Sequence, residues 1–192
     1  MFKIIKKVSD STESELTQHC TDLIPQMTPD VSNYAKGRYR LWLFHEALLT
    51  KKRVIPAYFD GRLWQFCQRI YPGSNIALLT FGGEAHGIKS NGKILPHRDD
   101  TYAQELAYGV NFGASATFGY NTDRRGNNFT ATTVEYYHLE PGLIYQFNCK
   151  HQHAVVGHEP GRFSLNIWTI RNNLDKYPGF TLAPNIAALL PK

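Results

Sequence analysis

The stretch from His153 to Trp168, HAVVGHEPGRFSLNIW, carries the clearest structural pattern in the chain. Its second half alternates between two kinds of side chain. One side of the alternation holds Phe163, Leu165 and Ile167, and the other holds Arg162, Ser164, Asn166 and Trp168. A period of two predicts a β-strand. Because an indole is seldom left bare in water, Trp168 favours a ligand-lined cavity over a solvated sheet face.

Two histidines and one aspartate precede or open this stretch: His97, Asp99 and His153. Two imidazoles and a carboxylate form the facial triad that holds Fe(II) and leaves coordination positions open. Arg162 follows, and its rigid fork of N–H donors suits a carboxylate. Ser164 points the same way along the strand. An iron site beside an anchor for a dicarboxylate indicates an oxygenase that depends on 2-oxoglutarate.

A second pair of the same type, His138 and Glu140, competes with the first. It runs into Pro141-Gly142, a turn signal, so its glutamate is expected at a strand end facing water. The order of the motifs favours the first pair. His153 lies 54 positions after Asp99, which is room for about four strands with their turns.

Composition limits the class of protein. The chain has 192 residues, of which 42% are hydrophobic and 13% aromatic, so one globular domain is expected. No apolar run approaches the roughly 20 residues that span a bilayer, and residues 1–7 do not form a secretory signal. Three cysteines without a CxxC pair favour a reduced setting. We therefore expect a cytoplasmic protein without a membrane partner.

The net charge of +5 permits an acidic partner such as nucleic acid but does not require one. Most basic residues are scattered. Three local groups stand out, and they are Arg38/Arg40, Lys51-Lys52-Arg53 and Arg124-Arg125. Tyr120 and Phe129 lie near the last group in the sequence, which leaves base stacking open.

Residues 1–74 are predicted to form a helical N-terminal support region. Residues 11–15 suit a helix start, with acidic residues in the first turn. Residues 34–49 and 61–71 carry apolar residues at helical spacing. The tail, residues 172–192, contains three prolines and is predicted to be an irregular strap.

Residues 75–171 change to strands and turns. The predicted strands are 76–81, 108–120, 132–139, 143–147, 153–156 and the strand from Arg162. The glycine-rich segment 82–92 lacks the GKS/T of a phosphate loop. Because it directly precedes His97, it is predicted to be a mobile lid, with His86 as a lid or substrate contact.

Helices followed by about eight short strands, with the triad at these places, resemble the Fe(II)/2-oxoglutarate oxygenases. The resemblance covers residues 75–171 and implies a double-stranded β-helix, or jelly-roll, core flanked by helices: a mainly β (α+β) fold. It implies that His97, Asp99 and His153 bind Fe(II) and that O2 is a co-substrate. It also implies that Arg162 and Ser164 bind the far carboxylate of 2-oxoglutarate.

Other residues compete for the position of the distal ligand. His151 is one, but the Ala-Val that follows His153 and the spacing to Arg162 favour His153. Cys149, His151 and His153 could instead mimic a zinc site, though no fourth ligand is evident.

The run His97-Arg98-Asp99-Asp100 and the arginine-led strand resemble the AlkB branch, which oxidises alkylated nucleic acid bases. That branch has Arg-x-Asn-x-Thr-x-Arg, where this chain has Arg162-x-Ser164-x-Asn166-x-Trp168. Phe81 also stands where a tyrosine would help to bind the co-substrate. A nucleic acid base is the first expected substrate, with a small molecule or peptide as the alternative.

Four further residues receive roles in this hypothesis. Asn111, Trp168 and His86 are predicted substrate contacts, and Asp100 is predicted to orient a metal ligand. Two rival functions stay open. One is a cupin-like metal isomerase or hydrolase, which would need no arginine at position 162. The other is a binding module that keeps the barrel without catalysis.

Overall fold

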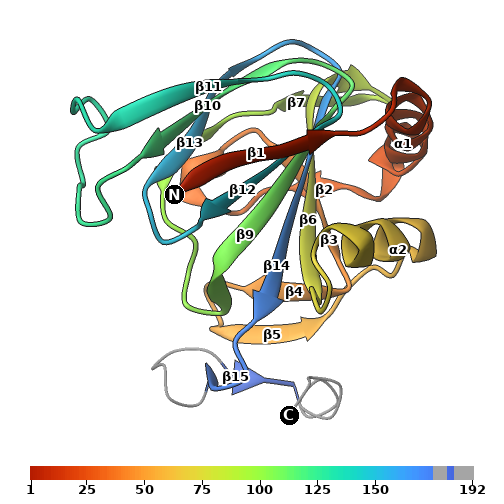
Figure 1. The fold of residues 1–192 in the computed structure, drawn as a ribbon. Coiled ribbons are helices and arrows are strands. Elements are labelled where there is room, and N and C mark those ends of the chain that lie inside the picture. Colours follow the sequence, from red (N-terminus) through yellow and green to blue (C-terminus); the bar gives the residue numbers. More distant parts are fainter. Residues whose placement is uncertain (175–180, 184–192) are drawn as a thin grey trace.

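Two antiparallel sheets pack face to face in the computed structural model, which describes residues 1–174 and 181–183 (Figure 1). The larger sheet has the order β1 (Phe2–Lys7), β12 (Leu143–Asn148), β9 (Ala103–Phe112), β14 (Arg162–Ile170), β6 (Ile76–Ala85), β3 (Tyr39–Leu43) and β2 (Thr28–Pro29), and β7 (Ile88–Asn91) pairs with β6. The smaller sheet has the order β11 (Val134–Leu139), β10 (Ala116–Asn121), β13 (His153–His158) and β8 (Ile94–His97). This is the mainly β, jelly-roll core that the sequence predicts.

A third, small sheet lies beside this core. It consists of β4 (His45–Leu48), β5 (Arg53–Pro56) and β15 (Thr181–Leu182), and β15 runs parallel to β5. Residues 175–180 and 184–192 of the predicted strap, which include its three prolines, lie outside the described residues.

Two helices cover the outer face of the larger sheet: α1 (Asp10–Asp22) and α2 (Gly61–Ile70). Each begins at a capping side chain. Ser9 accepts a hydrogen bond from the Thr12 backbone N–H, and Asp60 accepts one from that of Leu63. Two short 3-10 turns, η1 (Ile24–Gln26) and η2 (Asn33–Ala35), lead into the sheet. None of the described helices has the length and apolar character of a membrane-spanning segment.

The core has two layers. Aromatic rings fill the space between the two sheets, where Phe118 of β10 contacts Tyr145 and Phe147 of β12 at centroid distances of 5.3 and 5.4 Å. The second layer lies between the larger sheet and the helices, and there Phe66 of α2 packs on Phe112 of β9. Side chains of the larger sheet thus alternate between the helices and the interior, which places one parity of β14 inside the jelly roll.

The helix predicted over residues 34–49 is wrong, because β3 and β4 occupy this segment. Here the apolar residues that match a helical spacing also alternate along a strand. Pairing of β3 with the edge of β6 decides between the two. Phe44, at φ 69°, then turns the chain into β4.

Two other predicted elements are also corrected. The long strand over 108–120 is broken at Gly113, which has φ +73° and where a Cβ would lie 2.3 Å from the Gly161 carbonyl oxygen. The lid predicted over 82–92 is instead the β6–β7 hairpin, with His86 at φ 51° in its turn. Backbone pairing therefore holds a segment that its glycines made look mobile.

Gly109 of β9 provides a stability prediction. It lies opposite Tyr145, and a Cβ there would stand 2.1 Å from the Tyr145 ring carbon Cζ. Gly109→Ala is expected to lower the free energy of unfolding by about 1–3 kcal/mol, as overpacking of a core does. Chemical denaturation measures the loss. Gly157→Ala is the control, since nothing lies within 4 Å of its added Cβ; equal losses in both variants would contradict the packing argument.

Candidate metal centre

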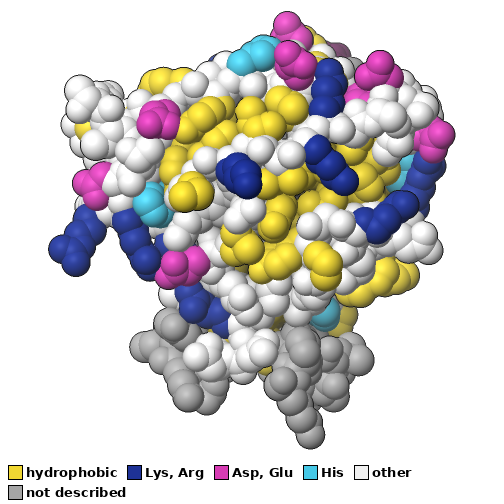
Figure 2. Space-filling view, viewed as in Figure 1, with side chains coloured by type: hydrophobic (Ala, Val, Ile, Leu, Met, Phe, Trp, Pro, Cys, Tyr) yellow, Lys and Arg dark blue, Asp and Glu magenta, His cyan; other side chains and the backbone are white. Residues whose placement is uncertain are grey.

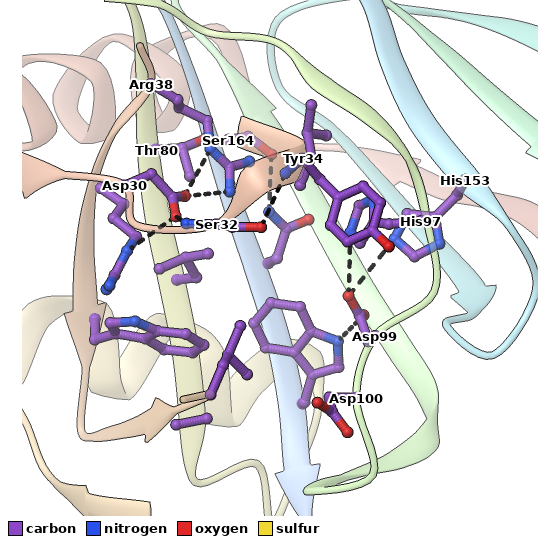
Figure 3. A pocket seen from close by; sticks show the side chains of 18 of the residues that line it. Asp30, Ser32, Tyr34, Arg38, Thr80, His97, Asp99, Asp100, His153 and Ser164 are labelled. Atoms are coloured by element: carbon purple, nitrogen blue, oxygen red, sulfur yellow. Dashed lines mark hydrogen bonds and ion pairs between the residues drawn. The ribbon is translucent and has the colours of Figure 1, made fainter. Parts of the chain in front are cut away.

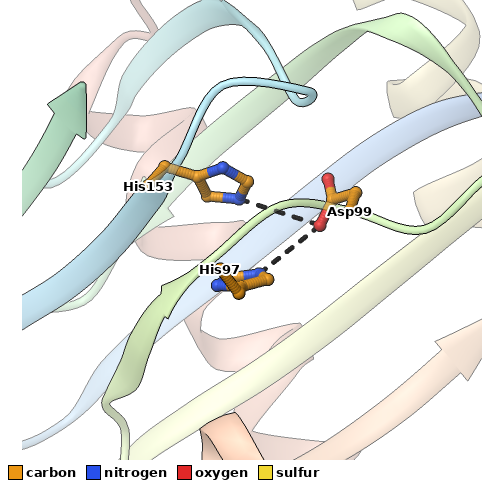
Figure 4. A group of neighbouring side chains, drawn as sticks. All are labelled: His97, Asp99 and His153. Carbon is orange, nitrogen blue, oxygen red and sulfur yellow. Dashed lines mark ion pairs between the residues drawn. The ribbon is translucent and has the colours of Figure 1, made fainter. Parts of the chain in front are cut away.

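His97, Asp99 and His153 meet between the two sheets (Figure 4). Each offers one ligand atom, and the three atoms lie within 4.8 Å of one another. Asp99 Oδ1 is 3.4 Å from His97 Nε2 and 3.7 Å from His153 Nε2. The chain thereby brings together the three residues that the sequence predicts as metal ligands, in the N2O donor set suited to Fe(II).

Backbone pairing places these three residues. His97 ends β8 and His153 begins β13, and the two are partners in the antiparallel register. The Asp99 backbone N–H donates to the Cys149 carbonyl at 3.0 Å. Lys150 Nζ donates to the carbonyls of Asp99 and Asp100 at 3.2 and 2.6 Å. The loop after β8 is therefore fixed to the turn before β13.

Hydrogen bonds also set the tautomer of each imidazole. His97 Nδ1 lies 2.9 Å from the Leu95 carbonyl oxygen, and His153 Nδ1 lies 2.9 Å from that of His151. A carbonyl can only accept, so Nδ1 carries the proton in both rings. Nε2 is then the free lone pair, and in both rings it is the atom nearer Asp99.

The protonation states suit metal binding, which requires neutral imidazoles and an ionised carboxylate. Burial lowers the pKa of His153 to about 4, and the neighbouring His97 adds to this effect. Burial acts to raise the pKa of Asp99, but His153 and His97 beside it outweigh burial and hold that pKa at about 2. At neutral pH, His153 is therefore neutral and Asp99 is charged.

Trp168 of β14 holds the other oxygen of the carboxylate. Its indole Nε1 donates to Asp99 Oδ2 at 2.8 Å (Figure 3). The sequence predicted Trp168 as a substrate contact, and the residue does line the cavity. The hydrogen bond to Asp99 is a second role, which leaves Oδ1 as the oxygen facing the two histidines.

Trp168→Phe keeps an aromatic ring and removes only this donor. Loss of a hydrogen bond to a ligating carboxylate is expected to weaken metal affinity by roughly 10- to 100-fold. Calorimetric titration with Mn(II) measures the change in affinity. Trp42→Phe serves as the control, because among the described residues the Trp42 indole N–H has no hydrogen-bond partner. Equal affinity in wild type and Trp168→Phe would contradict this role.

Arg162 begins β14, lines the cavity and is 2% exposed. Its Nε donates to Asn111 Oδ1 at 2.7 Å. Asn111 is fully buried and in turn donates to the carbonyls of Ala114 and Leu139. These bonds fix the amide, which orients Arg162. The sequence predicted Asn111 as a substrate contact; the structure places it outside the cavity lining.

The guanidinium of Arg162 is incompletely paired. Within the described part of the chain its Nη2 is buried with no hydrogen-bond partner, and no carboxylate forms an ion pair with it. Burial lowers its pKa to about 10, with Arg38 acting in the same direction, so it stays charged at neutral pH. A buried cation with an unused donor is costly alone, and the outer carboxylate of a dicarboxylate fits it.

Tyr145, Ser164 and Thr80 line the cavity near Arg162. Burial raises the pKa of Tyr145, while Arg162 and a hydrogen bond with Ser164 act against it, so the phenol stays protonated. Phe81, where the sequence analysis looked for a tyrosine, belongs to the other parity of β6 and packs towards the helices. Tyr145 of β12 supplies a phenol here, a position that the sequence analysis missed.

The metal centre opens into a cavity of about 630 Å³. The N-terminal part of its wall was not predicted from the sequence, and it includes Asp30, Tyr34, Arg38, Arg40, Trp42 and Glu46. Figure 3 shows the first three of these side chains. Tyr34 lies over His97, with ring centroids 5.8 Å apart. Alternation from Arg38 to Leu43 was the available signal, but the helical interpretation of this region hid it.

The remaining predicted residues lie elsewhere. His86 is exposed at the β6–β7 turn and does not line the cavity. Asp100 lines the cavity, but its side chain pairs with Lys52 at 2.7 Å and bonds none of the three metal-site residues.

The competing ligands also lie outside the group. His138 is exposed on β11, His151 Nδ1 bonds the Asn121 carbonyl, and Cys149 Sγ donates to the Gln104 carbonyl. In the described residues, the group that could hold a metal ion is therefore His97, Asp99 and His153.

Solved structures share this architecture. OsALKBH1 matches with a TM-score of 0.63 at 12% identity, over 88% of this chain and 97% of that one. An oxidoreductase of the 2OG-Fe(II) oxygenase family from Burkholderia pseudomallei matches with a TM-score of 0.56 at 12% identity, over 87% and 84%. A Pseudomonas putida prolyl-4-hydroxylase matches with a TM-score of 0.56 at 12% identity, over 88% and 92%. No family model and no curated protein matches the sequence. The fold of this chain is the fold of the Fe(II)/2-oxoglutarate oxygenases.

Proposed function

We propose that the protein is an Fe(II)- and 2-oxoglutarate-dependent dioxygenase that oxidises a C–H bond of an organic substrate. One observation carries the proposal. The triad of His97, Asp99 and His153 and the incompletely paired Arg162 line the same cavity. A cupin-like isomerase or hydrolase would use the triad but has no need for a buried cation at position 162.

Each residue has a defined task in this proposal. The two Nε2 atoms and Asp99 Oδ1 would hold Fe(II), and Arg162 with Ser164 and Tyr145 would bind the outer carboxylate of 2-oxoglutarate. When bound, the metal and 2-oxoglutarate supply the oxidising power from O2, with succinate and CO2 as co-products. The buried walls of the cavity keep water from the reacting C–H bond.

The substrate expected first from the sequence, a nucleic acid base, has limited support. In the face that Figure 2 shows, Lys and Arg side chains are scattered among apolar ones and form no continuous track. Of the basic groups singled out in the sequence, Arg124 pairs with Glu105 and Arg40 lines the cavity. We therefore place a small organic molecule ahead of a nucleic acid base.

An anaerobic titration with Fe(II) and then 2-oxoglutarate tests the cofactor chemistry. A 2-oxoglutarate chelate of Fe(II) gives a visible charge-transfer band, and we expect this band in the wild-type protein. Bound iron without a band at saturating 2-oxoglutarate would reject the oxygenase and favour the cupin-like alternative. Absence of bound iron would leave only the non-catalytic binding module.

A further inference from the structure

A cluster of four charged residues, Asp30, Arg38, Arg40 and Glu46, lines the cavity. Figure 3 shows Asp30 and Arg38 on the opposite side of the view from His97, Asp99 and His153. Asp30 lies at its centre, with its side chain 4% exposed. Arg38 donates to Asp30 Oδ2 from Nη2 and Nε, at 2.7 and 3.1 Å. Arg40 Nε is 3.4 Å from Asp30 Oδ1, and Arg40 Nη1 donates to Glu46 Oε1 at 3.3 Å. Two cations thus share two carboxylates.

The cluster keeps hydrogen-bonding groups in reserve. Arg38 Nη1, Arg40 Nη2 and Glu46 Oε2 form no hydrogen bond within residues 1–174 and 181–183. The side chains of Arg38 and Arg40 are only 7% and 10% exposed. Their free Nη atoms nevertheless keep some accessible surface. All three residues line the cavity, so these groups are available to an occupant. The wall therefore offers two cationic donors and one anionic acceptor.

Charge balance narrows the chemistry of an occupant. The two arginines balance Asp30 and Glu46, and the charges of Arg98 and Asp100, which also line the cavity, are opposite. At the other end, Fe(II) and Arg162 would balance Asp99 and a doubly charged 2-oxoglutarate. Buried charges are stable only when paired, so an occupant with a net charge would upset a balanced cavity. A zwitterion adds no net charge and supplies an anion for the arginines and a cation for Glu46.

The wall beside this cluster includes an aromatic ring. Trp42 lies beside it, with the Arg40 guanidinium carbon 5.5 Å from the ring centroid. The ring centroids of Trp42 and Trp168 are 6.3 Å apart, and Trp168 donates the hydrogen bond to Asp99. An aromatic surface thus leads from the ion cluster to the metal centre, as a substrate with an apolar side chain requires.

We propose that the substrate is a small zwitterion of the α-amino acid class, with its carboxylate on Arg38 and Arg40 and its ammonium group on Glu46. The side chain would lie along Trp42 with a C–H bond at the metal. This inference rests on the proposed oxygenase function. In the balanced reaction, one oxygen atom of O2 enters the C–H bond as a hydroxyl and the other enters succinate. Reduction of O2 takes four electrons. Two come from the C–H bond, and two come from 2-oxoglutarate, which loses CO2 and becomes succinate.

Calorimetry on the protein loaded with Mn(II) and 2-oxoglutarate tests the inference without turnover. The probes are the twenty protein amino acids, followed by the des-amino and decarboxylated analogues of the tightest binder. Each analogue lacks one hydrogen-bonded charged group and is expected to bind roughly 10- to 150-fold more weakly. An oligonucleotide with a methylated base is titrated in parallel.

Two variants connect binding to the cluster. Glu46→Gln should weaken the amino acid by at least about tenfold and leave the des-amino analogue unchanged, because only the ammonium group loses its partner. Arg40→Gln should weaken both, with 2-oxoglutarate affinity unchanged. Glu84→Gln and Arg62→Gln remove the same charges at exposed ion pairs and are the matched controls.

The outcomes separate this inference from the proposed function. Binding of Mn(II) and 2-oxoglutarate without any amino acid overturns the substrate class and leaves the oxygenase standing. Tight binding of the methylated oligonucleotide alone also overturns it. Amino acid affinity that Glu46→Gln does not change removes the cluster from recognition, even if Arg40→Gln fails to fold. Amino acid binding without Mn(II) or 2-oxoglutarate binding would support the cluster and reject the oxygenase.

Discussion

His153→Ala is expected to abolish specific metal binding. His153 supplies one of three ligand atoms within 4.8 Å of one another, and its lone pair is already directed by the bond from Nδ1 to the His151 carbonyl. Loss of a residue that merely orients a ligand costs roughly 10- to 100-fold in metal affinity, so removal of a ligand should exceed about 100-fold. Mn(II) titration measures the affinity, and the charge-transfer band with Fe(II) should be absent.

His151→Ala is a stringent control for this result. It removes an imidazole two residues away that stacks on Tyr120 and bonds the Asn121 carbonyl. Metal affinity should stay within about twofold of the wild type. The variant keeps the His151 backbone carbonyl that lies 2.9 Å from His153 Nδ1, and separate sites couple by only about 0.3–0.5 kcal/mol. If His151→Ala loses the metal and His153→Ala keeps it, the assignment of the distal ligand is wrong.

Arg162→Ala should produce the second large effect, a loss of 2-oxoglutarate affinity with metal binding retained. Arg162 is fully buried, and its partner in the chain is the neutral Asn111. A buried carboxylate that loses its cation is destabilised by about 3–5 kcal/mol, which corresponds to a rise in Kd of roughly a hundredfold or more. Titration of the anaerobic Fe(II) protein with 2-oxoglutarate measures the shift.

Two comparisons make this result specific. Arg69→Ala removes an exposed arginine on α2 and should leave the 2-oxoglutarate Kd unchanged. Asn111→Ala leaves the guanidinium in place but removes its orienting acceptor, so it should give an intermediate loss. An unchanged Kd in Arg162→Ala would mean that the outer carboxylate binds elsewhere in the cavity.

Local patterns in the sequence single out the three residues that meet at the candidate metal centre. His97 and Asp99 are two positions apart in a short motif, and the strand from Arg162 alternates clearly between two faces. Both patterns survive folding unchanged, since a strand with one buried face has little freedom in register. The predicted strands 132–139, 143–147 and 153–156 correspond to β11, β12 and β13 for the same reason.

The far wall of the cavity could not be predicted in this way. The segment from Arg38 to Leu43 is compatible with a helix or a strand, and its pairing with β6 arises from a contact about 40 residues away in the chain. The role of Asn111 likewise depends on Arg162 lying beside it across β9 and β14. Partners that are distant in the sequence leave no local signal, so local patterns place residues on strands but not beside one another.

The hydrogen bond between Trp168 and Asp99 has a consequence for the molecule as a whole. His97 and His153 belong to the smaller sheet. The Trp168 indole, which donates to Asp99, belongs to the larger sheet. A bound ion would therefore link the two sheets of the jelly roll. By thermodynamic linkage, metal at 100 times its Kd would add about 2.7 kcal/mol to the free energy of unfolding. The free energy of unfolding would then increase with metal occupancy and decrease when the metal is removed.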